Sequence, residues 1–142
     1  MTYGISLYYP LSPLTLTKPL HILQNRTLRL VCGSQQKRKK TLSNLFIAHS
    51  TNVLPLPHLS TYFACVCAHS IKLRQCPPYL YEPFTGTSTR KTRNQHKLPS
   101  SLHYNQLESY LVSQYNSLPL SLRRCSPHTF KHNLKKHLMS LV

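Results

Sequence analysis

The plainest structural signal in the chain is the stretch SPHTFKHNLKKHLMSL, residues 126–141. Its large apolar residues recur at intervals of four, four and three positions, which places them on one face of an α-helix: Phe130, Leu134, Leu138 and Leu141. Ser126 and Pro127 come just before this stripe, and they are residue types that favour the N-cap and the first helical position. The stretch therefore predicts an amphipathic helix over about 127–140 that buries its apolar stripe.

The remaining faces of this helix are basic, because they carry Lys131, Lys135 and Lys136. Positive charge in the last turns of a helix is favoured by the helix dipole. Long lysine stems can lie along apolar surface while the ammonium groups stay in water. We expect these lysines to be exposed and able to contact phosphate groups.

Further segments have the spacing and the boundary residues of helices. Pro19 suits a first helical position and Gly33 a position just past the end, so a helix is predicted over 19–32. A broad apolar stretch predicts a buried helix over 58–73. Shorter helices are expected around 42–47 and 107–115, whereas Tyr3 to Tyr9 fits either a short strand or a helix end. The sequence thus predicts a mainly α fold: a small, irregular assembly of about four to five helices with long Pro-rich and basic loops.

The length of 142 residues predicts at most one domain. Residues 85–97 are polar and basic, which indicates a flexible loop between an N-terminal helical segment, 1–84, and a C-terminal segment, 98–142. The hydrophobic content of 40% is enough for a core. Charge of one sign repels itself in a compact state, so we expect marginal stability unless a polyanion or a larger protein body neutralises it.

The charge balance restricts the chemistry that this chain can perform. Lys and Arg number 18, whereas the only acids are Glu82 and Glu108, and the net charge is +16. Without Asp the chain lacks a paired-Asp magnesium site and an Asp-oriented catalytic triad. We therefore predict no catalysis, no cofactor and no small-molecule substrate. A strongly basic chain is typical of partners such as RNA, DNA or another anionic surface.

Three basic clusters are the candidate phosphate contacts. They comprise Lys37, Arg38, Lys39 and Lys40; Arg90, Lys91, Arg93 and Lys97; and Arg123 and Arg124 with Lys131, Lys135 and Lys136. The first cluster fits a phosphate-contacting patch, a nuclear localisation signal or a plain solvated loop equally well. Several tyrosines near these clusters fit either base stacking or a half-buried position in the core: Tyr79, Tyr81, Tyr104, Tyr110 and Tyr115.

The cysteines do not form a recognisable metal or catalytic motif. One residue separates Cys65 from Cys67, whereas zinc ligands are usually separated by two to four, and on a helix the two side chains point about 200° apart. His69 and Cys76 do not complete a set, so we expect the thiols to act as small hydrophobes and predict no metal site. An odd cysteine count and no secretory leader predict an intracellular protein, nuclear or cytoplasmic, and not a secreted one. No apolar run approaches the roughly 18 residues of a membrane span, so no membrane partner is expected.

The stretch 115–138 carries an ordered series of short motifs. It reads YNSLP at 115–119, LR at 122–123 and FKHNLK at 130–135, followed by Leu138. This series resembles the C-terminal ending of non-LTR, jockey-like retrotransposon reverse-transcriptase proteins, which reads W-N-S-L-P, I/L-R and F-K-x-x-L-K-x-x-L. One departure is Tyr115, where that family usually carries Trp. Further elements resemble the family in the same order: YGI at 3–5, PL and LQNR with Arg29 within 19–29, LPL at 54–56, PPYL at 77–80, and TRN with LP at 92–99.

The resemblance implies a place in a parent protein, namely the thumb and tail that follow the polymerase palm. The family's catalytic acids belong to the palm, so the resemblance implies a truncated, non-catalytic segment that grips RNA or template DNA and contacts a polymerase body. The sequence also leaves two rival interpretations open. The chain is either a free-standing small basic RNA-binding protein or an inert product of a decayed transposable element.

Overall fold

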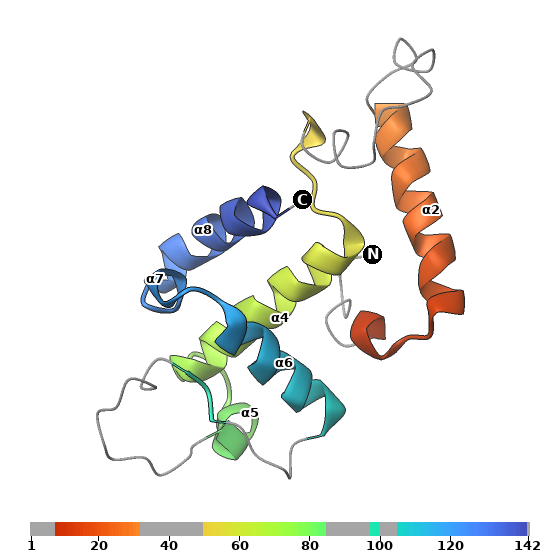
Figure 1. The fold of residues 1–142 in the computed structure, drawn as a ribbon. Coiled ribbons are helices and arrows are strands. Elements are labelled where there is room, and N and C mark those ends of the chain that lie inside the picture. Colours follow the sequence, from red (N-terminus) through yellow and green to blue (C-terminus); the bar gives the residue numbers. More distant parts are fainter. Residues whose placement is uncertain (1–7, 32–49, 85–96, 100–104, 142) are drawn as a thin grey trace.

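The computed structural model describes residues 8–31, 50–84, 97–99 and 105–141, and all regular structure within these ranges is helical (Figure 1). The elements in chain order are η1 (Tyr9–Leu11), α2 (Leu14–Val31), α4 (Leu56–Lys72), α5 (Pro78–Tyr81), η3 (Glu82–Phe84), α6 (Gln106–Ser117), α7 (Leu120–Arg123) and α8 (Pro127–Ser140). The prediction of a mainly α fold is confirmed.

The predicted helices match the observed ones to different degrees. Helix α8 has the predicted bounds, and α4 and α6 differ from the predictions by one or two residues at each end. The prediction that Pro19 begins its helix was wrong, because α2 starts at Leu14 and contains Pro19 within it. The Pro13 carbonyl accepts hydrogen bonds from the amides of Leu16 and Thr17, which starts the helix one turn earlier. The helix expected around 42–47, and Gly33, lie outside the described residues.

Local side-chain chemistry sets two helix starts in different ways. At α6, Asn105 Oδ1 accepts from the Glu108 amide at 2.8 Å, and Glu108 Oε2 accepts from the Asn105 amide at 3.0 Å. This reciprocal capping box satisfies two backbone donors that otherwise lack partners. At α8, Ser126 is the N-cap residue as predicted, but its hydroxyl lies 3.0 Å from the Thr129 hydroxyl and makes no side-chain cap bond to the backbone.

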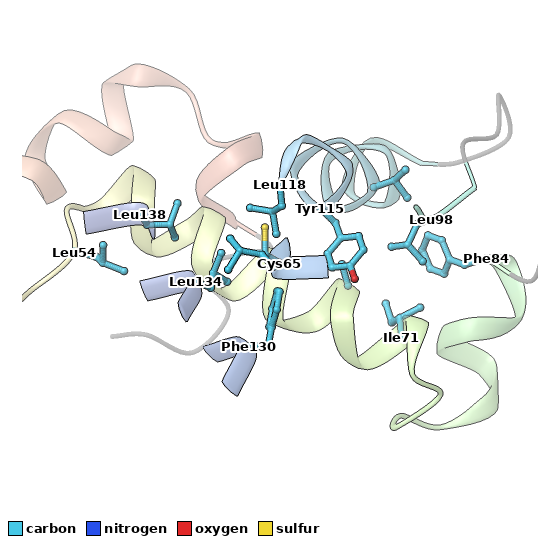
Figure 2. Packing of buried hydrophobic residues seen from close by; sticks show 13 residues of the cluster. Leu54, Cys65, Ile71, Phe84, Leu98, Tyr115, Leu118, Phe130, Leu134 and Leu138 are labelled. Atoms are coloured by element: carbon cyan, nitrogen blue, oxygen red, sulfur yellow. The ribbon is translucent and has the colours of Figure 1, made fainter. Parts of the chain in front are cut away.

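The core lies where α4 packs against α6 and α8, as Figure 2 shows. Its largest fully buried side chains are Tyr115 from α6 and Phe130 and Leu134 from α8. The remaining members of the cluster are Leu54, Cys65, Ala68, Ile71, Phe84, Leu98, Val112, Leu118, Leu122 and Leu138. The apolar stripe predicted for α8 is buried through Leu138, whereas Leu141 is exposed.

The two segments on either side of 85–97 contribute to a single core. Phe84 and Leu98, which flank that stretch, both belong to the buried cluster. The amide side chain of Asn116 makes two hydrogen bonds of 2.9 Å to the backbone N–H and carbonyl of Leu98. This pairing fixes residues 97–99 against α6, although residues 85–96 are outside the described part of the chain.

Candidate nucleic-acid interface

The structure describes one of the three predicted basic clusters and one residue of another. Lys97 is exposed beside the buried Leu98. The C-terminal cluster lies on α7, α8 and the turn between them. The remaining predicted contacts lie outside the described residues, namely Lys37, Arg38, Lys39, Lys40, Arg90, Lys91 and Arg93.

The outer face of α8 carries several basic residues. Phe130, Leu134 and Leu138 turn the opposite face into the core. Residues four apart share a helix face, so Lys131 lies next to Lys135, and Lys136 lies one turn beyond His132. Lys131 and Lys136 are exposed and Lys135 is half-buried. Because the apolar stripe fixes the rotation of the helix, the lysines are held on a rigid surface and not on a loop.

No carboxylate accompanies these lysines along the sequence. Residues 109–142 contain neither Asp nor Glu, and Glu108 is engaged in the capping box of α6. The positive potential of α7 and α8 is therefore not reduced by acids of their own. Such a surface attracts polyanions, and the attraction weakens as salt rises.

Histidines extend this basic face, and the sequence analysis did not select them. His128 and His132 are exposed on α8 and His137 is half-buried. His128, His132 and Lys136 follow one another at intervals of four residues, so they form a single row along the helix. The four-residue spacing is visible in the sequence, and it could have identified these histidines as part of the α8 surface.

Lys72 is a second residue that the sequence analysis missed. Its ammonium group donates to the Arg123 carbonyl at 3.0 Å and lies 5.8 Å from the centre of the Tyr115 ring. Arg123 in turn donates from Nε to the Leu118 carbonyl at 3.0 Å. Lys72 closes α4 and Arg123 closes α7, so these bonds place a lysine and an arginine side by side at one end of the bundle.

The proximity of Lys72 and Arg123 changes the electrostatics of the lysine. Burial lowers the pKa of Lys72, and the nearby positive charge of Arg123 lowers it further. Two cations held together without a carboxylate repel each other, and an anion placed between them relieves that repulsion. The pair is thus a candidate phosphate contact where α4 and α7 end, and the neighbouring Arg124 is exposed.

His69 is buried in the core behind this surface, and its contacts are those of a structural residue. Nδ1 of His69 lies 3.0 Å from the Tyr115 hydroxyl, and its ring stacks on Phe130 with centroids 3.9 Å apart and planes inclined by 9°. Burial lowers the pKa of His69, and Lys72 adds to this effect, while the Cys125 backbone partly opposes it. The imidazole is enclosed by core residues, so it holds helices together and does not face solvent.

The thiols that the sequence places near His69 differ in their surroundings. Cys65 is fully buried in the core, and burial raises its pKa to about 12. Cys67, two positions along α4, is exposed. Among the described residues no group of three or more His, Cys, Asp or Glu side chains is arranged to hold a metal ion.

The tyrosines divide between the two roles that the sequence left open. Tyr115 is fully buried and is a core residue, whereas Tyr79 is 70% exposed at the start of α5. Tyr110 is half-buried on α6. Tyr104 lies outside the described residues, as does the Tyr81 side chain. Of this set, Tyr79 is the ring that the described structure leaves open to stacking.

The helices that the structure describes include none that is long and apolar enough to span a bilayer. Comparison with known proteins adds no relative: no family model, curated protein or solved structure matches this chain.

Proposed function

We propose that this chain is a non-catalytic nucleic-acid-binding polypeptide that recognises phosphate backbones without sequence preference, and that it corresponds to the C-terminal tail of a non-LTR retrotransposon reverse transcriptase. The observation that carries the binding proposal is the basic outer face of α8, which has no carboxylate near it in sequence and is held rigid by a buried apolar stripe. The origin in a retroelement rests on the motif order described above.

The binding mode follows from the chemistry of the surface. Lysine and arginine cations neutralise phosphates and release the counterions condensed on the nucleic acid, which is favourable and independent of base sequence. Lys131 and Lys136 supply exposed charges, and Lys72 with Arg123 supplies a second point of contact. Phosphate contacts of this kind set position and affinity but do not read bases.

Salt dependence is the direct test of this mode. Binding of the full chain to a fluorescein-labelled single-stranded RNA and to a labelled DNA duplex is measured by anisotropy between about 50 and 200 mM salt. Each phosphate neutralised steepens the log–log slope by about 0.7 on a single strand and about 0.9 on a duplex. The triple variant Lys131→Gln, Lys135→Gln, Lys136→Gln is expected to lower the slope by about two to three on duplex DNA.

A matched control removes charge elsewhere. The double variant Lys18→Gln, Arg26→Gln changes exposed cations of α2, away from α8, and is expected to leave the slope within about one of the unaltered chain. A flat salt response in the unaltered chain contradicts the electrostatic mode. Equal salt-dependence slopes for the triple variant and the unaltered chain show that the lysines of α8 do not contact the nucleic acid.

Thermal unfolding separates the proposal from its rivals. A sharp, cooperative loss of helical circular dichroism favours a self-sufficient RNA-binding protein. A broad loss that sharpens when nucleic acid is added favours a tail that needs a partner, since a ligand of the folded state stabilises it. A broad loss without any response to nucleic acid favours an inert product of a decayed element.

A further inference from the structure

Two free thiols, Cys67 and Cys76, lie on either side of the point where α4 ends. Cys67 belongs to the last two turns of α4, and Cys76 lies between α4 and α5. The side chain of Cys67 is exposed and that of Cys76 is half-buried. Thiols that reagents can reach are the ones open to exchange and oxidation, whereas fully buried thiols are inert.

A Schellman motif ends α4 and turns the chain back on itself. Arg74 has a left-handed backbone, with φ of 53°, and its amide donates to the Ile71 carbonyl at 3.0 Å. The Gln75 amide donates to the Ser70 carbonyl at 2.9 Å. These two bonds are the pair that defines the motif. Because Cys76 directly follows Gln75, it leaves the turn beside the last turn of α4 and not further along the helix axis.

Cys67 lies on the side of α4 that this turn reaches. Ser70, whose carbonyl holds Gln75, comes three positions after Cys67 and is therefore its neighbour on the helix surface. Cys76 packs against the edge of the buried cluster, and α5 contacts α4 just beyond it (Figure 1). Partial desolvation raises the pKa of the Cys67 thiol, and the neighbouring Cys76 raises it further, which indicates that the two sulfur atoms are near each other.

The other described cysteines are not placed to compete for Cys67. Cys65 is fully buried, and its side chain points about 200° away from that of Cys67 on the same helix. The Cys125 backbone contacts His69, which is also two positions from Cys67 and therefore on the far side of α4. The fifth cysteine, Cys32, lies outside the described residues. Among the described thiols, Cys76 is thus the partner that the fold brings to Cys67.

The backbone at the two positions suits the formation of a bond. A disulfide needs Cα atoms about 4.4–6.8 Å apart and Cβ atoms that point towards each other. Cys67 is held by the helix, whereas Cys76 belongs to neither α4 nor α5, so no helical hydrogen-bond ladder fixes its dihedral angles. One rigid and one adjustable partner can meet the geometric requirement without unwinding α4.

We propose that Cys67 and Cys76 form a thiol–disulfide exchange site, which closes an intramolecular disulfide on reaction with a low-molecular-weight disulfide such as oxidised glutathione. The Cys67 thiolate attacks one sulfur of the glutathione disulfide and releases one glutathione thiolate. The Cys76 thiolate then attacks the Cys67 sulfur of the mixed disulfide and releases the second glutathione thiolate. Two protein thiols are oxidised, one glutathione disulfide is reduced to two thiols, and the two protons pass from the protein thiols to the released thiolates.

The disulfide closes a ring of ten residues, 67–76, around the end of α4. Exposed disulfides are the labile ones, so excess reduced glutathione is expected to reopen the ring. The ring contains Lys72, whose ammonium group donates to the Arg123 carbonyl. The cross-link therefore restrains the segment that carries one proposed phosphate contact, but the exchange itself needs only the two thiols and an oxidant. The proposal does not depend on nucleic-acid binding.

The test uses the full chain, first reduced and then freed of reductant. It is incubated with oxidised glutathione at about pH 8, where thiolates form, and the remaining thiols are blocked with iodoacetamide. Trypsin cleaves between the two cysteines, so they fall on separate peptides, 41–72 and 75–90. Mass spectrometry without reduction is expected to show these peptides joined, with the loss of two of the five free thiols.

Variants assign the bond to its two sulfur atoms. Cys67→Ser and Cys76→Ser are each expected to abolish the joined peptides and to leave glutathione on the remaining thiol. Cys65→Ala is the matched control, because it removes the other thiol of peptide 41–72 and is expected to keep the joined peptides. Cys125→Ser, at a half-buried position outside α4, is a second control with the same expectation. Circular dichroism confirms that each variant keeps its helical content.

A comparison with the unfolded chain separates the effect of the fold from that of closeness in sequence. The equilibrium between the pair and a mixture of reduced and oxidised glutathione gives the effective concentration of one thiol at the other. This effective concentration is expected to be at least about tenfold higher in buffer than in concentrated urea, because the turn after α4 holds the thiols together. Equal values in the two solutions overturn the proposal.

Other results also overturn it. Stable glutathione adducts on both Cys67 and Cys76 of the unaltered chain show that the two thiols do not reach each other. A dominant bond from either of them to Cys65 or Cys125 contradicts the placement described above. Disulfide-linked dimers as the main product in dilute solution assign the thiols to contacts between chains.

Discussion

The Tyr115 hydroxyl lies 3.0 Å from Nδ1 of His69 at the centre of the core, where α4 and α6 meet. Phe130 from α8 stacks on the face of the same imidazole, so one buried histidine contacts two other helices. A polar pair at this position has a directional requirement that apolar packing lacks. Burying a polar group costs free energy unless its hydrogen bond is made, so this pair favours one register of α4 against α6.

Replacing Tyr115 with phenylalanine tests the contribution of this bond. The variant Tyr115→Phe keeps the ring and removes the hydroxyl, which leaves Nδ1 of His69 without the Tyr115 hydroxyl. We expect the free energy of unfolding in urea to fall by about 1–3 kcal/mol, the cost of an unsatisfied buried polar group. Tyr79→Phe, at a position 70% exposed, is the control and is expected to change stability by less than about 0.5 kcal/mol. Equal stability of Tyr115→Phe and the unaltered chain contradicts a bond between the two side chains.

The same histidine makes stability depend on pH. Burial, with a further contribution from Lys72, lowers the pKa of His69 in the folded state. In the unfolded chain a histidine takes up its proton near pH 6.5, so below that pH the unfolded state binds more protons than the folded one. The stability contribution is complete above about pH 6.5 and is lost as the pH falls towards the lowered folded-state pKa.

Urea unfolding at a series of pH values measures this effect. The midpoint is expected to fall between about pH 7 and pH 5, and His69→Gln is expected to reduce that fall because the group with the lowered pKa is removed. His132→Gln, at an exposed position, serves as the control. A pH dependence that is the same with and without His69 assigns the acid sensitivity to other groups.

Core truncation provides a separate test of the α8 stripe. Leu134 is fully buried between the helices, whereas Leu141, two turns further along, is 61% exposed. Leu134→Ala is expected to lower the free energy of unfolding by about 2–5 kcal/mol through lost burial and the cavity left behind. Leu141→Ala is expected to cost less than about 0.5 kcal/mol. Comparable losses of unfolding free energy for the two variants contradict the observed orientation of α8 about its own axis, which buries Leu134 and exposes Leu141.

Some of this architecture could be predicted from sequence, and the reasons differ between elements. Helix α8 was predictable because its stripe, proline and flanking polar residues all act within a few positions of one another. Lys72 was not found because its partner Arg123 is 51 positions away, and only the fold brings them together. The exposure of Lys131 and Lys136 was predictable from the buried stripe of α8, whereas Lys135 is half-buried.

Helix α2 shows that local sequence patterns do not determine which side of a helix is attached to the rest of the protein. Its spacing predicts a helix, but not which side is attached, because Gln24 bonds to backbone groups 30 and 32 positions away. Pro19 was a misleading boundary signal: a proline is tolerated inside the helix at the loss of one hydrogen bond, and the Pro13 carbonyl had already started the helix. A local contact, the Pro13 carbonyl, therefore set the start of α2, and the long-range bonds of Gln24 set its orientation.

The anchoring of α2 by Gln24 yields a last prediction. Gln24→Leu preserves the approximate size of the side chain and removes both hydrogen bonds, which leaves the Leu54 carbonyl and the Leu56 amide without these partners. At a net value of about 0.5–1.5 kcal/mol for each of the two bonds, the opening of α2 is expected to become about 5- to 140-fold more frequent. Hydrogen exchange monitored by mass spectrometry measures this as faster labelling of residues 14–31, with unchanged labelling of α8.

The matched control for Gln24 is Gln106→Leu, which alters an exposed glutamine at the start of α6 and is expected to leave α2 labelling unchanged. If Gln24→Leu also leaves the labelling of α2 unchanged, the buried Thr17 and Leu28 and the hydrogen bond between Tyr9 and His21 are enough to hold the helix. If it accelerates labelling throughout α4 and α8, α2 unfolds together with the core. The expected result, faster exchange confined to α2, follows because a single polar side chain links this helix to Leu54 and Leu56, whereas α4, α6 and α8 share a common apolar core.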